Sequence, residues 1–183
     1  MRVVIRGAGD LASGVALRLW RAGMDVVLLD VERPTAIRRT VAFSEAIVHG
    51  EQCVEDVTAR LAAVETVEET LAAGCIPVLV DPEGRSIQKL KPDALVDAIL
   101  AKRNLGTKIT DAPVVIGVGP GFTAGVDCHT VVETMRGHTL GRVIREGAAI
   151  PNTGIPGLIG GFAGERVLRA PAAGLFHPLR SIG

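Results

Sequence analysis

The segment Gly7-Ala8-Gly9-Asp10-Leu11-Ala12 matches the pattern G-x-G-x-x-G/A, whose small residues let a backbone turn approach an anion closely. Gly7 permits a tight turn between a strand and a helix, and Gly9 has no Cβ that would keep a diphosphate away. Ala12 is small enough for the helix to pack on the strand. Asp30 follows about twenty residues later, where a carboxylate can accept hydrogen bonds from ribose hydroxyls. We therefore predict that Gly7–Ala12 and Asp30 bind a dinucleotide-type ligand.

Charged residues near this turn leave alternatives open. Asp10 places a negative charge beside the expected phosphate position, although Asp at such a position more commonly caps a helix. Arg33, Arg38 and Arg39 could hold a ribose 2′-phosphate, but the charge of Asp30 opposes this, and we favour a solvated basic face. A Rossmann-type unit whose turn is empty, or that binds only a protein, is the competing interpretation of the motif.

A second glycine-rich loop, Gly117–Gly125, follows an apolar run later in the chain. Gly119 and Gly121 permit positive φ angles and can expose a row of N–H groups to an anion, and Thr123 adds a hydroxyl. We predict that Gly119, Gly121 and Thr123 face the ligand, and a tight turn into a hairpin is the alternative. Cys128 and His129 are adjacent, but neighbouring residues on a strand point to opposite faces, so a catalytic thiolate is the less favoured interpretation.

The elements that must position these residues alternate between strands and helices. Apolar runs predict parallel strands, a period of 3.6 predicts a helix that includes Leu11, Val15, Leu19 and Ala22, and a second helix runs from Thr66 to Ala73. The predicted strands are Val3–Ile5, Val26–Leu29, Val41–Phe43, Ala46–Val48, Ile76–Val80, Ala94–Ala101 and Pro113–Val118, with a hairpin of Thr130–Arg136 and Thr139–Ile144, and a last strand and turn over Arg166–Phe176. In an open parallel sheet the Gly7 turn, Asp30, Asp81 and the loop after Val118 share one edge.

Composition changes along the chain. Residues 1–116 hold 8 of the 22 glycines and residues 117–183 hold 14, and beyond Lys108 every basic residue is an arginine except the histidines. The fold class predicted is α/β: a Rossmann-like, mainly parallel nucleotide-binding domain over residues 1–118, then a Gly- and Arg-rich, mostly β segment over residues 119–183. The apolar stretch Leu179–Gly183 has no partner strand after it, so we expect a longer natural chain with a further C-terminal module.

Net charge and residue types argue against several classes of protein. The chain has 20 basic and 20 acidic residues, four Phe, one Trp and no Tyr, whereas nucleic-acid binders usually show a basic face or stacking aromatics. Its three cysteines have no metal-ligand or disulfide spacing, so no metal site is predicted. A strand begins at residue 3 and no apolar run reaches membrane-spanning length, which predicts a cytoplasmic protein without membrane contact.

With these residues laid out, the chain resembles the YqeB-type accessory proteins of selenium-dependent molybdenum hydroxylases, and more distantly the XdhC-type chaperones that carry molybdenum cofactor on a Rossmann domain. The stretches that carry the resemblance are RGAGDLASG (residues 6–14), LVDP (79–82), LKPDALVDAILAKRNLGT (90–107), GPGFTAGVD (119–127), ETMRGHTLGRV (133–143), PNTGIPG (151–157) and ERVLRAP (165–171).

This resemblance implies a maturation factor that helps install or modify the cofactor of these hydroxylases. It implies the hydroxylase apoprotein and other maturation proteins as partners, and it assigns no catalytic residues. It also implies a longer chain, with a segment after the RAP motif that is similar to the biotinyl/lipoyl module. A molybdopterin dinucleotide has the diphosphate and the ribose for which the Gly7 turn and Asp30 are suited.

Two other functions and the oligomeric state stay open at this point. An NAD-dependent oxidoreductase would use NAD and would need a proton donor such as Asp127, His129 or His138, but no acid/base pair is recognisable. A non-catalytic scaffold would bind partner proteins through an otherwise empty fold. The sequence does not decide whether a reaction is catalysed or whether the chain forms a homo-oligomer.

Overall fold

The computed structural model describes residues 1–174 and divides the chain into two units, Met1–Pro151 and Asn152–Gly183. The first unit is built on a sheet that, within the described residues, has nine strands in the order β10-β9-β7-β6-β1-β2-β5-β4-β3. These strands are β1 (Arg2–Arg6), β2 (Asp25–Asp30), β3 (Glu51–Val54), β4 (Val57–Leu61), β5 (Ile76–Val80), β6 (Ala94–Asp97), β7 (Val114–Val118), β9 (Thr130–Val132) and β10 (Val143–Ile144).

The strands from β4 to β9 in this order are parallel to their neighbours, and the antiparallel pairs are β3–β4 at one end and β9–β10 at the other. The chain moves outward from β1 to β2 and later β5, then returns to add β6 and β7 on the other side of β1. The direction of winding therefore reverses between β1 and β6, which is where open α/β sheets bind ligands, beyond the carboxyl ends of the strands. The α/β class and the mainly parallel sheet that the sequence predicts are confirmed.

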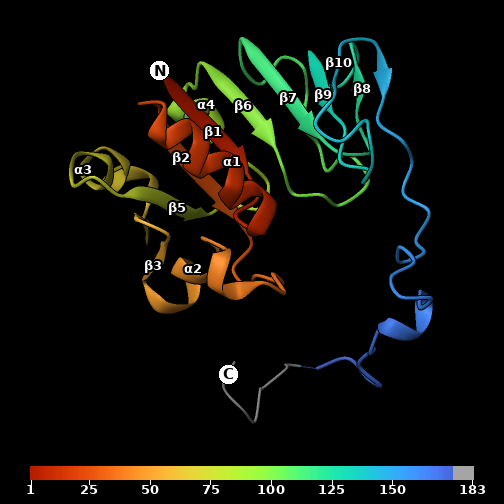
Figure 1. The fold of residues 1–183 in the computed structure, drawn as a ribbon. Coiled ribbons are helices and arrows are strands. Elements are labelled where there is room, and N and C mark those ends of the chain that lie inside the picture. Colours follow the sequence, from red (N-terminus) through yellow and green to blue (C-terminus); the bar gives the residue numbers. More distant parts are fainter. Residues whose placement is uncertain (175–183) are drawn as a thin grey trace. The chain divides into compact units, whose positions relative to one another are not determined.

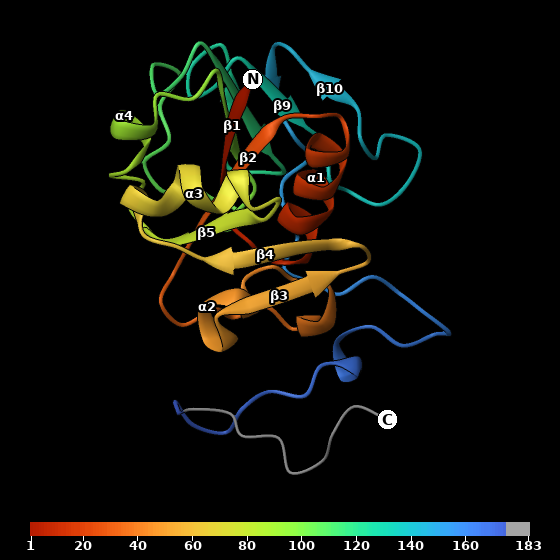
Figure 2. The ribbon, with the colours of Figure 1, turned by 90° about the vertical axis from the view of Figure 1, so that its left-hand side faces the viewer.

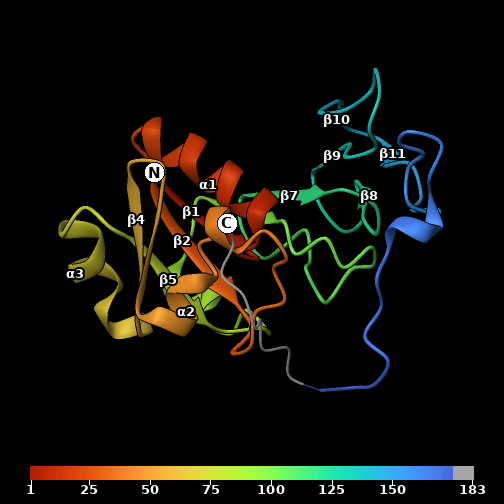
Figure 3. The ribbon, with the colours of Figure 1, turned by 60° about the horizontal axis from the view of Figure 1, so that its bottom comes forward.

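Alternate residues along each central strand face opposite sides of the sheet, and each side has its own apolar core. Val3 and Ile5 pack with α1 (Asp10–Arg21), which lies across β1 and β2 (Figures 1 and 3). Val4 on the other face packs with α3 (Val67–Ala72) and α4 (Ile87–Leu90). The helix α2 (Glu45–His49) lies beside the β3–β4 hairpin (Figure 2).

The helix predicted after the Gly7 turn is confirmed. Its most buried side, however, is not the one formed by the apolar residues Leu11, Val15, Leu19 and Ala22 that predicted it. Ala12, Ala16 and Leu17 are buried against the sheet, whereas Leu11 is exposed. Small alanine side chains let the helix axis approach the strands closely, so the larger apolar residues flank the contact.

Some predicted elements differ from those observed. Ala46–Val48 belongs to α2 and is not a strand, because the apolar run here is three residues long and a period cannot be read from it. The strand predicted over Ala94–Ala101 ends at Asp97. The hairpin predicted over Thr130–Arg136 and Thr139–Ile144 is present, but its strands are shorter and its loop is longer than predicted. Val131 pairs with Ile144, and Val132 pairs with Val143.

The sequence predicts a domain boundary after Val118, but the first compact unit continues to Pro151. A small two-stranded sheet of β8 (Thr123–Ala124) and β11 (Gly147–Ala148) and the strands β9 and β10 follow Val118, so this part of the segment is rich in β structure, as expected. The functional division after residue 118 stays a prediction.

The second unit has little regular structure in its described part. Ile159 and Phe162 form an isolated antiparallel bridge, and a turn of 3-10 helix covers Gly164–Arg166. No strand forms in the described part, Arg166–Gly174, of the strand and turn predicted over Arg166–Phe176. Arg166 ends the 3-10 turn, and the Val167 and Leu168 side chains are exposed, so no apolar face is buried here. The stretch Leu179–Gly183 lies outside the described residues. Across residues 1–174, no helix combines the length and the apolar character needed to cross a membrane.

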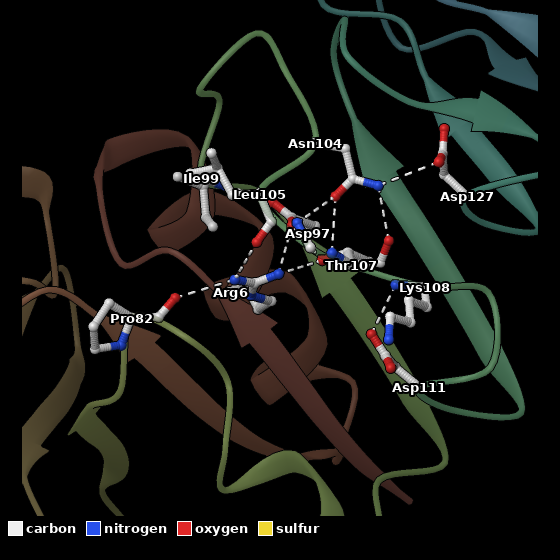
Figure 4. A network of polar contacts seen from close by, with 11 residues as sticks. Arg6, Pro82, Asp97, Ile99, Asn104, Leu105, Thr107, Lys108, Asp111 and Asp127 are labelled. Atoms are coloured by element: carbon white, nitrogen blue, oxygen red, sulfur yellow. Dashed lines mark hydrogen bonds and ion pairs between the residues drawn. The ribbon is translucent and has the colours of Figure 1, made fainter.

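A buried ion pair joins β1 and β6 at the point where the winding reverses. The Arg6 guanidinium lies 3.5 Å from the Asp97 carboxylate, and both side chains are almost fully buried. The Thr107 hydroxyl connects them: it accepts from Arg6 at 2.5 Å and donates to Asp97 at 2.6 Å (Figure 4). Asp97 also accepts the Ile99 backbone N–H at 3.2 Å, whereas Lys102 is exposed.

The same network holds the long β6–β7 connection against the sheet. Arg6 also donates to the carbonyl oxygens of Pro82 and Leu105, at 3.1 and 3.2 Å. Asn104 closes the loop by accepting from the Thr107 N–H and donating to its carbonyl. These hydrogen bonds fix the conformation of the connection, although it contains no helix.

We expect Asp97→Asn to lower the free energy of unfolding by about 3 kcal/mol, because it leaves the Arg6 guanidinium buried without a counter-charge. The exposed Asp25 on β2 makes no side-chain hydrogen bond within the described residues, so Asp25→Asn is the matched control and should change stability by less than about 0.5 kcal/mol. Urea denaturation of both variants measures this. Equal effects of the two substitutions would contradict the assignment.

Candidate functional site

A cleft of about 830 Å³ lies at the carboxyl edge of the sheet, beside the Gly7 turn. Its floor includes Gly7, Gly9 and Ala12, and Asp30 lies at its side. Three further segments line the cleft: residues 35–38, Ser44, and residues 98–102 without Ala101. The sequence singles out Arg38 for its charge and residues 90–107 for the resemblance, but the spacing alone does not place these segments beside the Gly7 turn.

The turn after β1 depends on a glycine at position 7. Gly7 has φ = +100°, and a Cβ there would lie 2.8 Å from the carbonyl oxygen of Ala98. Any larger residue would push the β6–β7 connection away from β1. Gly9, by contrast, has nothing within 4 Å of its Cβ position, so the space beside it is open.

The amino terminus of α1 presents unpaired N–H groups to this open space. Gly9 is the N-cap residue and supplies no side-chain cap. Within the described part of the chain, the N–H groups of Gly9, Asp10, Leu11 and Ala12 have no acceptor, and the first helical hydrogen bond runs from the Ser13 N–H to the Gly9 carbonyl. Unpaired N–H groups and the positive end of a twelve-residue helix dipole together favour an anion at this position.

The Asp30 carboxylate is held directly beside this turn. One oxygen accepts a hydrogen bond from the Ala8 N–H at 2.7 Å and the other accepts from the Val31 N–H at 2.7 Å. Burial raises the pKa of the Asp30 carboxyl, and these two hydrogen bonds from Val31 and Ala8 act in the opposite direction. Each oxygen keeps a lone pair that a hydroxyl group of a ligand can use.

The charge of Asp10 at the first turn of α1 has a local partner. Its carboxylate forms an ion pair with the guanidinium of Arg38, which comes from the segment after β2. Both residues line the cleft, and the Arg38 side chain is 69% exposed. The pair reduces the repulsion that Asp10 alone would exert on an anion at the helix terminus. Lys102 also lines the cleft and adds a further positive charge.

The second glycine-rich loop packs against its own chain. A Cβ at Gly121 would lie 2.6 Å from the backbone of Arg103, and one at Gly119 would lie 2.9 Å from the Thr134 hydroxyl. The Gly119 N–H donates to the Val132 carbonyl, and the Thr123 N–H donates to Asp127. None of Gly119, Gly121 and Thr123 lines the cleft, so the structure does not bring them together with the Gly7 turn. Their contact with a ligand stays a prediction.

Cys128 and His129 do not form a reactive pair. Cys128 is fully buried, and burial raises the pKa of its thiol, whereas a nucleophilic thiol needs a lowered one. The His129 Nδ1 accepts the Val115 N–H at 2.9 Å. Among residues 1–174, no three His, Cys, Asp or Glu side chains are grouped closely enough to hold a metal ion.

A smaller hollow of about 410 Å³ lies beside Asp81, and its polar side chains are already paired. Asp81 accepts from the Ser86 hydroxyl and N–H, Lys89 pairs with Glu65, and Arg85 pairs with Glu83. The cleft at the Gly7 turn is therefore the better candidate, because its donors are free.

The raised pKa of Asp30 predicts a pH dependence of stability. Between the ordinary carboxyl pKa and the raised one, the folded protein binds more protons than the unfolded chain, so stability falls as pH rises through this window. Asp30→Asn has no proton to lose there. We expect the unfolding free energy of the variant minus that of the natural protein to increase with pH from about 3.5 to 7, by urea denaturation. A difference that decreases over this range would contradict the placement of Asp30.

The chain is similar to the protein YqeB of Escherichia coli (strain K12), with 58% identity over 182 residues. The match covers 99% of this chain and 34% of that protein, so the chain spans about a third of the length of the curated relative. No protein-family model and no solved structure matches the chain. At this identity over nearly its whole length, the chain is a homologue of the matched third of YqeB, which agrees with the YqeB part of the resemblance found in its motifs.

Proposed function

We propose that the cleft binds a dinucleotide-type ligand, with its diphosphate at the amino terminus of α1 and a ribose beside Asp30. The observation that carries the proposal is the set of unpaired N–H groups at Gly9–Ala12, which open into a cleft of about 830 Å³. An anion there satisfies these donors and interacts favourably with the helix dipole. The Asp30 carboxylate lines the same cleft and contacts the same turn, and in this proposal it accepts hydrogen bonds from the ribose attached to that anion.

We further propose that the ligand is a molybdopterin dinucleotide and that the protein acts in maturation of selenium-dependent molybdenum hydroxylases. The resemblance of the motifs to YqeB-type accessory proteins supports this role, and the similarity to YqeB supports the YqeB part of that resemblance. The proposal places the hydroxylase apoprotein and other maturation proteins as partners in the cytoplasm. In this account the protein holds and presents a cofactor, so no residue of the cleft is assigned a catalytic step.

Ligand identity is tested by native mass spectrometry of protein freshly isolated from its own host, followed by calorimetric titration. We expect a retained dinucleotide, and we expect binding of a molybdopterin dinucleotide to be tighter than binding of NAD⁺. The single tryptophan, Trp20, lies on α1 and can transfer energy to bound NADH. Strong energy transfer to NADH together with no binding of the molybdopterin dinucleotide would favour the oxidoreductase alternative.

The position of the diphosphate is tested by Gly9→Asp. Gly9 has an ordinary extended backbone and open space at its Cβ, so the variant folds, but its carboxylate occupies and repels the anion position. We expect the affinity for CDP and GDP, which have the diphosphate and the ribose, to fall at least about tenfold, or about 1.4 kcal/mol.

Gly14→Asp is the matched control for this experiment. Gly14 lies on the same helix, is exposed and has nothing within 4 Å of its Cβ position, so the variant adds the same charge farther from the helix terminus. We expect it to change affinity by less than about twofold, because the dipole effect is confined to the first turn. Full binding of CDP and GDP by Gly9→Asp would show that the diphosphate does not bind at this turn.

A further inference from the structure

Ser44 has a buried hydroxyl group with no partner. The residue is fully buried, and its Oγ is one of three buried side-chain polar atoms without a hydrogen-bond partner among the described residues. The other two are the Nε atoms of Arg2 and Arg6, whose guanidinium groups make hydrogen bonds through their remaining nitrogens. Of these three side chains in the described part of the protein, Ser44 is therefore the one that makes no hydrogen bond at all. Such a group costs stability unless something else binds it.

Ser44 belongs to the lining of the cleft. Its own N–H donates to the Ala8 carbonyl at 2.9 Å. This bond fixes Ser44 against the Gly7–Ala12 turn, whose residues with unpaired N–H groups line the same cleft. The segment from Ala42 to Ala46 is buried throughout, so Ser44 cannot turn toward bulk water without moving its neighbours.

Ser13 provides an internal comparison. It is also fully buried and also contacts the Ala8 carbonyl, but its hydroxyl donates to that carbonyl at 3.1 Å and accepts the Phe43 N–H at 2.8 Å. Two buried serines thus flank the same residue of the turn. The Ser13 hydroxyl has both a donor and an acceptor within the protein, and the Ser44 hydroxyl has neither among the described residues.

We propose that the Ser44 hydroxyl donates a hydrogen bond to the diphosphate of the ligand, as a binding residue additional to the N–H groups of α1. This inference rests on the proposed function of the cleft. A phosphoryl oxygen is a charged acceptor, and a hydrogen bond to it is stronger than one to a neutral group. The unfavourable state of Ser44 in the free protein is relieved when the anion is present, so the group adds to affinity and not to stability.

The test compares Ser44→Ala with Ser13→Ala, using inorganic pyrophosphate and CDP as probes in calorimetric titration and thermal unfolding without ligand as the second readout. We expect Ser44→Ala to bind both probes about tenfold more weakly and to keep or raise Tm, because it removes an unpaired polar group. We expect Ser13→Ala to lower Tm by about 2–4 °C, because it breaks two hydrogen bonds. Its affinity should change less than that of Ser44→Ala.

Each other outcome overturns the inference in a recognisable way. Unchanged affinity of Ser44→Ala, with the natural protein binding both probes, rejects the role of Ser44 and leaves the proposed function standing. Weaker binding of CDP with unchanged binding of pyrophosphate places the contact elsewhere on the ligand. A Tm lowered as in Ser13→Ala shows that the hydroxyl has a partner inside the protein. A natural protein that binds neither probe rejects both proposals.

Discussion

The geometry of the site depends on the hydrogen bond between the Ala8 N–H and the Asp30 carboxylate. This bond joins the turn after β1 to the end of β2, and it satisfies the Ala8 N–H within the protein. The next four N–H groups, from Gly9 to Ala12, have no acceptor among the described residues, and their residues line the cleft. The Asp30 carboxylate and the proposed anion position are therefore neighbours along one turn.

Electrostatic compensation lets such a site exist beside two carboxylates. Asp10 is paired with Arg38, and the Asp30 carboxylate accepts hydrogen bonds from two N–H groups. Both arrangements reduce the negative potential at the amino terminus of α1. The buried ion pair of Arg6 and Asp97 serves a different purpose, because it fixes the β6–β7 connection, whose first residues line the cleft.

The sequence predicted the local parts of the cleft, and the binding of a ligand there stays a prediction. The spacing of Gly7, Gly9 and Asp30 follows from one strand–turn–helix–strand unit, and the parallel sheet places their ends on one edge, where they line the cleft. It could not predict Ser44, because the segment before it has no periodic pattern and reaches the turn only through tertiary contacts. It could not predict the ion pair of Arg6 and Asp97 either, because these residues are 91 positions apart and are adjacent only in the sheet.

The second glycine-rich loop illustrates the limit of motif shape. Gly119 and Gly121 do have positive φ angles, as a row of exposed N–H groups would require, but both pack against their own chain. Glycines in a sequence show that the backbone can adopt positive φ angles there. They do not show whether a ligand or another loop of the protein fills the space beside them.

The most direct test of the central claim is the change in backbone amide NMR signals when CDP is added to the protein. The account predicts downfield shifts of the amide protons of Gly9, Asp10 and Leu11, as they gain a charged acceptor, with little change at Gly14. Shifts confined to Gly119–Thr123, or no shift at the amino terminus of α1 at saturating CDP, would contradict it.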